Sequence, residues 1–361
     1  MVRHLYVHIP FCPKVCPYCS FYKEASDRNK TKAFLEAVLA SAEAAGAGLR
    51  PRTVFFGGGT PTALSTLQME FLIRGLRERV DFSEVEEFTV EMNPATVSLE
   101  KAASLRALGV NRVSMGVQSW DPDLLKTLGR VHSAGQARRS FEILREAGFE
   151  NINLDLIFGI PGQSLEIWMD SLATTTALAP EHVSAYCLTY EEDTEYFRRF
   201  QNGEIGQDDD RNAEFFERTM DHLGDSGYAQ YEISNYARPG CECLHNFAYW
   251  TGEEYEGLGP SAFSTRGGIR RRNVADTTEF IRRVGAGGPW HDFEEVVDEA
   301  TARAESLAFS LRTVHGVDAS EVSSGKAADL MGAGLVEPSS GRLVLTRRGR
   351  LLADAVAAEL I

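Results

Sequence analysis

Two hydrophobic patterns alternate along the first two-thirds of the chain. Short apolar runs predict β-strands at residues 5–9, 53–56, 87–91, 112–117, 151–158 and 182–188. The stretches between them have helical spacing and predict helices at 28–45, 66–80, 98–108 and 211–223. Further helices are predicted between the fourth strand and residue 147, and another is predicted to start near residue 164. Six strand–helix units in series are typical of a parallel sheet.

The predicted fold class is therefore α/β. A doubly wound sheet and an incomplete (β/α)6-type barrel both fit the pattern, and the curved barrel is the preferred prediction. In either case ligands bind at the carboxyl ends of the strands. This places five features at the expected site: the loop after the first strand, the run Gly57–Thr60, Glu91, Gln118 and Asp155.

The pattern changes after residue 230 and predicts three regions. Residues 1–230 form the partial barrel, and 231–290 form an aromatic-rich connecting segment. Residues 291–361 are expected to fold as a smaller α+β domain of the winged-helix type. That domain reads as helix, helix, hairpin and helix, with 334–337 paired to 342–346 in the hairpin.

Composition narrows the function classes. The 361 residues carry a net charge of −15, which opposes general binding to nucleic acid. Basic runs at Arg270–Arg272 and around Arg347 are interpreted as solvated surface or as a protein-docking face. No apolar run approaches the roughly 20 residues of a membrane span. Residues 1–11 are too short and too polar for a signal peptide, so a cytoplasmic location is expected.

Three of the six cysteines form a C-x3-C-x2-C run at Cys12, Cys16 and Cys19. Three thiolates on one loop can hold three corners of a [4Fe–4S] cluster and leave one iron for a non-protein ligand. Structural zinc usually takes two separated pairs, and a redox C-x-x-C would not explain Cys12. The spacing therefore favours the cluster.

Other candidates are ambiguous from the residues alone. Glu91, Gln118 and Arg130 could each be solvated loop residues, whereas Asp155 places a charge inside an apolar strand and needs a partner or a ligand. If residues 245–250 are helical, His245 and Tyr249 share a face and could border a flat ligand, or they could simply belong to the core. An extended chain would put Cys241, Cys243 and His245 on one side as a soft-metal or haem-thiolate site, or the spacing is coincidental.

Together these motifs resemble a known family. The segments Tyr6–Cys19 and Gly57–Pro61 resemble radical S-adenosylmethionine (SAM) proteins. The segments 116–119, 129–132 and Asp155–Gly162 resemble the branch that contains oxygen-independent coproporphyrinogen III oxidase. The resemblance covers nearly the whole chain, the winged-helix-like tail included.

Within that branch, three features favour the HemW-type haem chaperones over the oxidase. The oxidase pattern has a further cysteine where this chain has Phe21, and it has a longer segment before the cluster motif than the 11 residues here. HemW-type proteins also carry an H-N-x-x-Y-W motif implicated in haem binding, which His245–Trp250 matches. Radical SAM decarboxylation of coproporphyrinogen III and another radical SAM tailoring reaction are the alternatives, so enzyme activity stays open.

The resemblance implies the following site. Cys12, Cys16 and Cys19 bind the [4Fe–4S] cluster, and His245 contacts haem as cargo. The residues that match the family's SAM shell are Tyr6, Tyr18, Gly58, Gly59, Thr60, Glu91, Gln118, Arg130, Asp155 and, by a looser alignment, Thr189. The implied partners are haem and apo-haemoproteins that accept it, and a homodimer is one assembly that the resemblance allows.

Overall fold

The computed structural model describes residues 1–25, 27–46 and 48–361 of the chain. Each strand–helix unit expected from the sequence is present. The elements of this part are β1 (Val2–Ile9), α1 (Arg28–Ala45), β4 (Leu49–Gly58), α2 (Thr66–Arg79), β5 (Glu87–Met92), α3 (Leu99–Ala107), β6 (Arg112–Gln118), α4 (Pro122–Thr127), α5 (Ala134–Glu146), β7 (Ile152–Phe158), α6 (Leu165–Ala177), β8 (His182–Cys187), α7 (Glu195–Gln201) and α8 (Asp209–Asp225).

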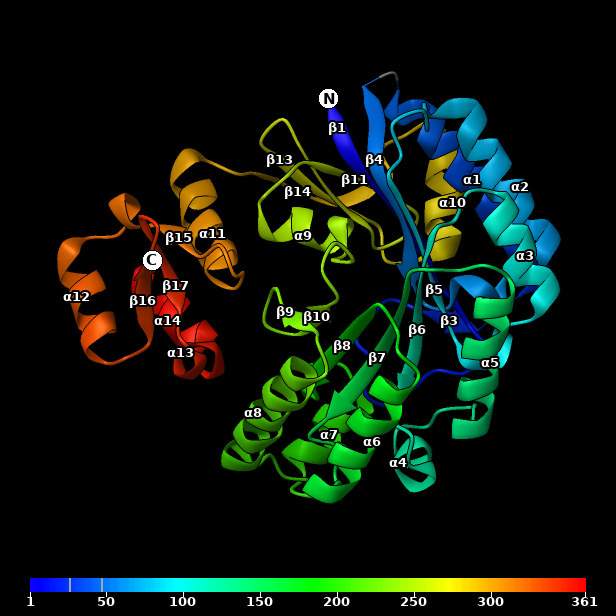
Figure 1. Cartoon of the computed structure of the whole chain (residues 1–361). Helices are drawn as coiled ribbons and strands as arrows, with labels where there is room; N and C mark the ends of the chain where they lie inside the picture. The colour runs from blue at the N-terminus through cyan, green and yellow to red at the C-terminus, as the bar shows by residue number, and fades with distance from the viewer. Residues whose placement is uncertain (26, 47) are drawn as a thin grey trace.

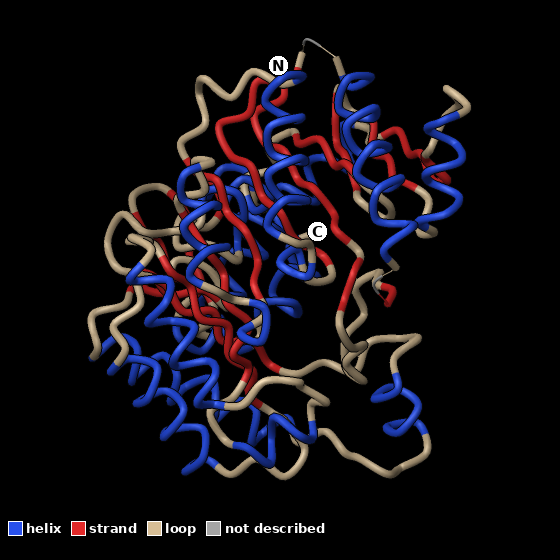
Figure 2. Tube along the Cα trace, turned by 90° about the vertical axis from the view of Figure 1, so that its right-hand side faces the viewer, coloured by secondary structure: helices blue, strands red, loops and turns tan. Residues whose placement is uncertain are grey.

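The strands β1, β4, β5, β6, β7 and β8 are parallel and stand side by side in chain order. Helices α1, α2, α3 and α5 cover one face of this sheet (Figure 1). Figure 2 shows the same layering, with the red strands inside the blue helices. This is the partial α/β barrel that the sequence predicts, because the sheet ends at two edge strands instead of closing.

The sheet is wider than the six predicted strands. On the β1 side it continues through β11 (Tyr255–Leu258), β12 (Phe263–Arg266), β13 (Ile269–Asn273) and β14 (His291–Val296), and on the β8 side through β10 (Asn235–Ala237) and β9 (Ala229–Gln230). Strand β11 is parallel to β1, and α10 (Thr277–Gly285) packs beside α1. The aromatic-rich segment therefore contributes strands and a helix to the main sheet and its helical layer.

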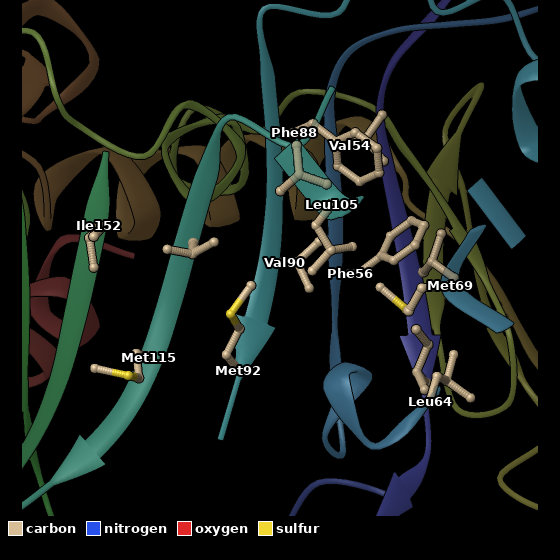
Figure 3. Packing of buried hydrophobic residues seen from close by; sticks show 14 of the residues in the cluster. Val54, Phe56, Leu64, Met69, Phe88, Val90, Met92, Leu105, Met115 and Ile152 are labelled. Atoms are coloured by element: carbon tan, nitrogen blue, oxygen red, sulfur yellow. The ribbon is translucent and has the colours of Figure 1, made fainter. Parts of the chain in front are cut away.

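The core lies between the strands and the outer helices. Phe56, Phe88, Val90 and Met115 are among its buried side chains, and Met69 of α2 belongs to the same cluster (Figure 3). Alternate residues of the same strands point the other way, as the period of a β-strand requires. On strand β5, for example, Phe88 and Val90 belong to the apolar core while Glu91 lines a cavity.

The C-terminal part folds around a separate core. It consists of α11 (Glu299–Leu311), α12 (Ser324–Gly332), the strands β15 (Val317–Asp318), β16 (Val336–Ser339) and β17 (Arg342–Leu345), and the helices α13 (Arg347–Leu351) and α14 (Ala353–Leu360). Its core is built from side chains such as Leu311, Leu330 and Val356. The predicted order of helix, helix, hairpin and helix is confirmed. Within the described ranges, every helix is too short or too polar to cross a lipid bilayer.

The arginines of the basic run on β13 form ion pairs with acidic side chains of this same chain. Arg270, Arg271 and Arg272 each pair with an acidic side chain of the neighbouring strand β14. In the tail, Arg347 pairs with Asp221 of α8 at 2.5 Å. These arginines join elements of the chain to one another.

Candidate functional site

A cavity of about 460 Å³ opens at the carboxyl ends of the parallel strands, and we call it the strand-end cavity. Ten of the fourteen predicted site residues line it: Tyr18, Cys19, Gly58, Gly59, Thr60, Glu91, Gln118, Arg130, Asp155 and Thr189. They come from seven separate segments of the chain. The fold brings them together at the carboxyl ends of the parallel strands, where ligands are expected to bind in an α/β barrel.

Glu91 stands near the end of β5 and is half-buried at the cavity wall. Its Oε2 accepts a hydrogen bond of 3.2 Å from the backbone N–H of Gly58. Burial, with a smaller contribution from the nearby Asp155, raises the pKa of Glu91 to about 8, although the Gly58 hydrogen bond opposes the shift. A positively charged ligand would favour the ionised form of this carboxyl.

Asp155 occupies the middle of β7 and faces the same cavity. Its carboxylate accepts hydrogen bonds from Asn153 Nδ2 at 2.7 Å and from Ser114 Oγ at 3.2 Å. Burial raises the pKa of Asp155, and its hydrogen bonds to Ser184, Asn153 and Ser114 act in the opposite direction. The charge in this apolar strand therefore has both protein partners and a cavity in front of it.

Gln118 and Arg130 form the next part of the wall. Gln118 ends β6 with a φ of +68°, at a register shift between β6 and β7. A non-glycine residue in this region of backbone space is strained, and such residues often occur at functional sites. Arg130 Nη2 donates to the carbonyl of Gly116 at 2.8 Å, and its Nη1 lies 3.8 Å from Cys16 Sγ.

Two buried donors of this cavity have no partner. The Nε atoms of Arg130 and Arg112 make no hydrogen bond to any described residue, although both arginines line the cavity. Unsatisfied buried donors are costly unless a ligand or water meets them. Glu91 and Asp155 line the same cavity, which therefore offers partners for both charges of a zwitterionic ligand.

The glycine run after β4 has a packing role as well as a place in the wall. Gly58 has a φ of +103°, and a Cβ there would lie 2.5 Å from the His8 ring. A Cβ on Gly59 would lie 2.7 Å from the backbone of Pro10. These glycines let the end of β4 meet the end of β1, where the cysteine loop begins.

The three cysteines occupy one loop beside the cavity. Cys12 belongs to β2 (Phe11–Cys12), which pairs with β3 (Glu24–Ala25), and its Sγ lies 3.5 Å from Thr60 Oγ1. The N–H of Cys19 donates to the carbonyl of Cys16 at 3.3 Å, which tightens the turn. Burial raises the pKa of Cys12 and of Cys19, and repulsion from the neighbouring thiolates adds to both shifts.

The loop fits a multi-iron cluster on its donor set. All three thiols are free of disulfide bonds, and they are close enough to influence one another's ionisation. Arg130 lies against Cys16 and would offset negative charge on a thiolate cluster. In the described part of the chain, no group of three His, Cys, Asp or Glu side chains is arranged to hold a single metal ion.

Two further predicted residues complete this region. Tyr6 lies on β1 behind the cavity wall, and its hydroxyl donates to His8 Nδ1 at 3.1 Å. Burial raises the pKa of Tyr6, with a further rise from Glu91. Thr189 lines the cavity and donates to Glu191 Oε1 at 2.8 Å.

A second cavity, of about 590 Å³, is lined in part by the short helix α9 (Leu244–Trp250), and we call it the aromatic cavity. Its aromatic lining residues are Tyr186, Tyr249, Trp250, Tyr255, Phe263 and Phe309. Three residues of the H-N-x-x-Y-W segment, Asn246, Tyr249 and Trp250, therefore face it. Asn246 and Tyr186 line both cavities.

His245 itself lies beneath this wall, and it lines neither cavity. Its Nδ1 is 2.7 Å from Thr53 Oγ1, its Nε2 is 2.9 Å from the Tyr249 hydroxyl, and its ring stacks on Phe55. Burial lowers the pKa of His245 well below its usual value, with a smaller contribution from His4. The predicted one-turn pairing of His245 with Tyr249 is confirmed, and the imidazole is held neutral inside the protein.

Glu87 and Arg112 are functional candidates that the sequence analysis did not single out. Glu87 accepts the N–H groups of Leu244 at 2.8 Å and of His245 at 3.1 Å, so it fixes the start of α9. Cys243 is the N-cap of that helix, which interrupts the extended chain needed to align Cys241, Cys243 and His245. The signal in the sequence was a charged residue at the beginning of a predicted strand, since Glu87 begins β5 and Arg112 begins β6.

The comparisons with known proteins agree with one another. The radical SAM superfamily matches residues 6–174. The chain is similar to the haem chaperone HemW of Bacillus subtilis, with 37% identity and 98% of each chain covered. It is also similar to HemW of Mycobacterium tuberculosis, with 36% identity over 99% of this chain and 94% of that one. Among solved structures, coproporphyrinogen III oxidase (HemN) from Escherichia coli, a radical SAM enzyme, matches with a TM-score of 0.86 and 25% identity over 99% of this chain and 90% of that chain.

Proposed function

The chain belongs to the HemW family of the radical SAM superfamily, and we propose that it is a haem chaperone that binds haem and transfers it to apo-haemoproteins. The observation that carries the proposal is the position of the H-N-x-x-Y-W segment. Similarity to HemW chaperones spans 98% of the chain, and this segment forms a wall of a large aromatic cavity.

The aromatic cavity suits a flat apolar ligand. Aromatic rings bury large apolar areas and stack on planar ligands, and Tyr and Trp add a polar group at the edge. Trp250 of α9 and Phe309 of α11 approach each other with ring centroids 6.1 Å apart, so these two helices together bound the cavity. In this proposal His245 acts by holding the Tyr249 hydroxyl, and a direct contact with haem would require α9 to move.

The strand-end cavity supports the second part of the proposal, a resident [4Fe–4S] cluster with SAM. Cys12, Cys16 and Cys19 would hold the cluster, and the nine other residues of the strand-end cavity listed above, with Tyr6, would surround SAM. When bound, the pair can supply one-electron chemistry. Glu91 and Asp155 would face the positive charge of SAM. The unpaired Nε donors of Arg112 and Arg130 would face its carboxylate.

Oxygen-independent oxidation of coproporphyrinogen III is the alternative function. The structural similarity to coproporphyrinogen III oxidase over 99% of the chain supports it. The chaperone is preferred because Phe21 stands where the oxidase pattern has a cysteine. A cytoplasmic location and a homodimer stay predictions.

One anaerobic experiment separates the two functions. The reconstituted protein is titrated with haem, mixed with an apo-haemoprotein, and assayed in parallel for SAM cleavage and for decarboxylation of coproporphyrinogen III. Tight haem binding and transfer with little SAM cleavage is the expected result. Porphyrinogen decarboxylation at useful turnover, without haem transfer, would contradict the chaperone proposal.

A further inference from the structure

The aromatic cavity contains a single cation. Arg270 of β13 is the only Lys, Arg or His among the described residues that line it, and Glu232, Glu253 and Glu305 are the acids. A ligand that presents carboxylates to this cavity therefore has one strong partner available. Arginine is well suited to that role, because its planar fork matches a carboxylate with two parallel hydrogen bonds.

That partner is occupied by the protein itself. Arg270 Nη1 donates to Glu305 Oε1 at 2.9 Å, and Nη2 donates to Glu305 Oε2 at 2.6 Å. A third bond, of 3.1 Å, joins Nη1 to Glu295 Oε2 on the adjacent strand β14. Glu305 thus fills the fork with the same bidentate geometry that a ligand carboxylate would use.

The pair also joins two parts of the molecule. Arg270 belongs to the extended sheet, while Glu305 belongs to α11, the first helix of the C-terminal part. On the same helix, Phe309 completes the cavity wall against Trp250. A change in the partner of Arg270 therefore changes what holds this end of α11 to the sheet.

We propose that Arg270 receives a carboxylate of the planar ligand of the aromatic cavity, in exchange for Glu305, and that this exchange couples ligand binding to α11. The inference deepens the proposed haem-binding function and rests on it. No bond to carbon changes, because one carboxylate replaces another on the same guanidinium. Glu295 keeps its hydrogen bond during the exchange, so Arg270 stays in position on β13.

The exchange has a favourable balance. Glu305 loses a partly exposed ion pair but gains contact with water, since its side chain is already 30% exposed. The ligand gains the bidentate contact and at the same time buries its apolar ring against the aromatic wall. A ring without a free carboxylate would gain only the burial of its apolar surface.

The neighbouring ion pair provides a matched control. Arg271 and Glu294 pair at 2.7 Å across the same two strands. Successive residues of a strand point to opposite faces, and Arg271 lines a different cavity from Arg270. Substitutions of this pair remove the same kinds of charge, with Arg271 on the same strand as Arg270, and neither residue lines the aromatic cavity.

The test compares iron protoporphyrin IX with its dimethyl ester, which retains the ring but has no free carboxylate. Dissociation constants are measured on the full chain for the wild type and for E305Q, R270Q, E294Q and R271Q. We expect E305Q to bind the free acid about five- to tenfold more tightly, with ester binding unchanged. R270Q should bind the acid no better than the ester, while E294Q and R271Q behave as wild type.

Hydrogen exchange supplies a second readout that does not depend on affinity. Binding of the free acid to the wild type should increase amide exchange in residues 299–306, and binding of the ester should not. In E305Q this region should exchange faster before any ligand is added. Circular dichroism confirms that each variant is folded.

The outcomes separate this inference from the function on which it rests. Equal binding of acid and ester in the wild type and in every variant would overturn the role of Arg270 and leave haem binding intact. Loss of acid binding in R271Q as large as in R270Q would also overturn it. Failure of both ligands to bind the wild type would overturn the haem proposal and this inference together.

Discussion

At the scale of single residues, Glu91 should make SAM binding depend on pH. Its pKa of about 8 lies well above that of an ordinary carboxyl because the group is buried. A cationic ligand binds the ionised form better, so SAM affinity should rise as the pH increases through about 8 and then level off. Isothermal titration of the reconstituted protein between pH 6.5 and 9 would measure it.

The control for this effect is E91Q, which cannot ionise. It should bind SAM more weakly at high pH and show little change in affinity across the same range. A wild-type affinity that is flat with pH would show that Glu91 does not face the bound cation.

The cysteines lead to a second prediction at this scale. Cys16→Ala removes one of three thiolates from the loop and should abolish most of the reconstituted iron, because the two remaining thiols cannot hold a cluster firmly. Cys187→Ala is the matched control, since Cys187 is a free thiol that lines the strand-end cavity but lies outside the motif. Iron and sulfide analysis with the absorption spectrum would measure both variants, and equal iron content would contradict the assignment.

At the scale of elements, the position of α9 depends on Glu87. This carboxylate accepts two N–H groups from the first turn of the helix. Glu87→Ala leaves those buried donors unpaired and should destabilise the fold by roughly 2–4 kcal/mol. Urea denaturation would measure the loss, and hydrogen exchange should increase first in residues 244–250.

The neighbouring residue provides the comparison. Glu86 pairs with Arg52 on the exposed surface, where an ion pair is worth less than about 1 kcal/mol. Glu86→Ala should therefore leave stability nearly unchanged. Equal losses in both variants would mean that Glu87 does not hold α9 in place.

The elements of the fold differ in how clearly the local sequence encodes them. Strands β4–β8 were predictable because each apolar run sits between good helices, and helix starts such as Ser65 and Ser133 carry capping boxes. Strand β11 was missed because it has only four residues, including a glutamate and a glycine. Its pairing with β1 is set by tertiary contacts that no local pattern encodes.

The candidate site was also predictable only in part from the sequence. Strand-end position and the family resemblance located the strand-end cavity, whose wall includes Glu91 and Asp155. The burial of His245 was not predictable, because its partners Thr53 and Phe55 come from β4, nearly 200 residues earlier in the chain. Sequence spacing shows which residues share a helix face, but it does not show what covers that face.

At the scale of the whole molecule, the two cavities share a wall. Asn246 of α9 and Tyr186 of β8 each line both the strand-end cavity and the aromatic cavity. A ligand in one cavity therefore contacts side chains that the other ligand also contacts. We expect SAM to change the affinity of the protein for haem by about fivefold or more.

Thermodynamic linkage makes this prediction strict, because haem must then change the affinity for SAM by the same factor. Both dissociation constants are measured with and without the second ligand, in the wild type and in Asn246→Ala. The variant should bind each ligand with reduced coupling, since one shared side chain is gone. Thr189→Ala lies in the strand-end cavity alone, so it should weaken SAM binding and preserve the coupling factor. Identical haem affinities with and without SAM would show that the shared wall does not transmit binding, and that the cluster site serves the chaperone in another way.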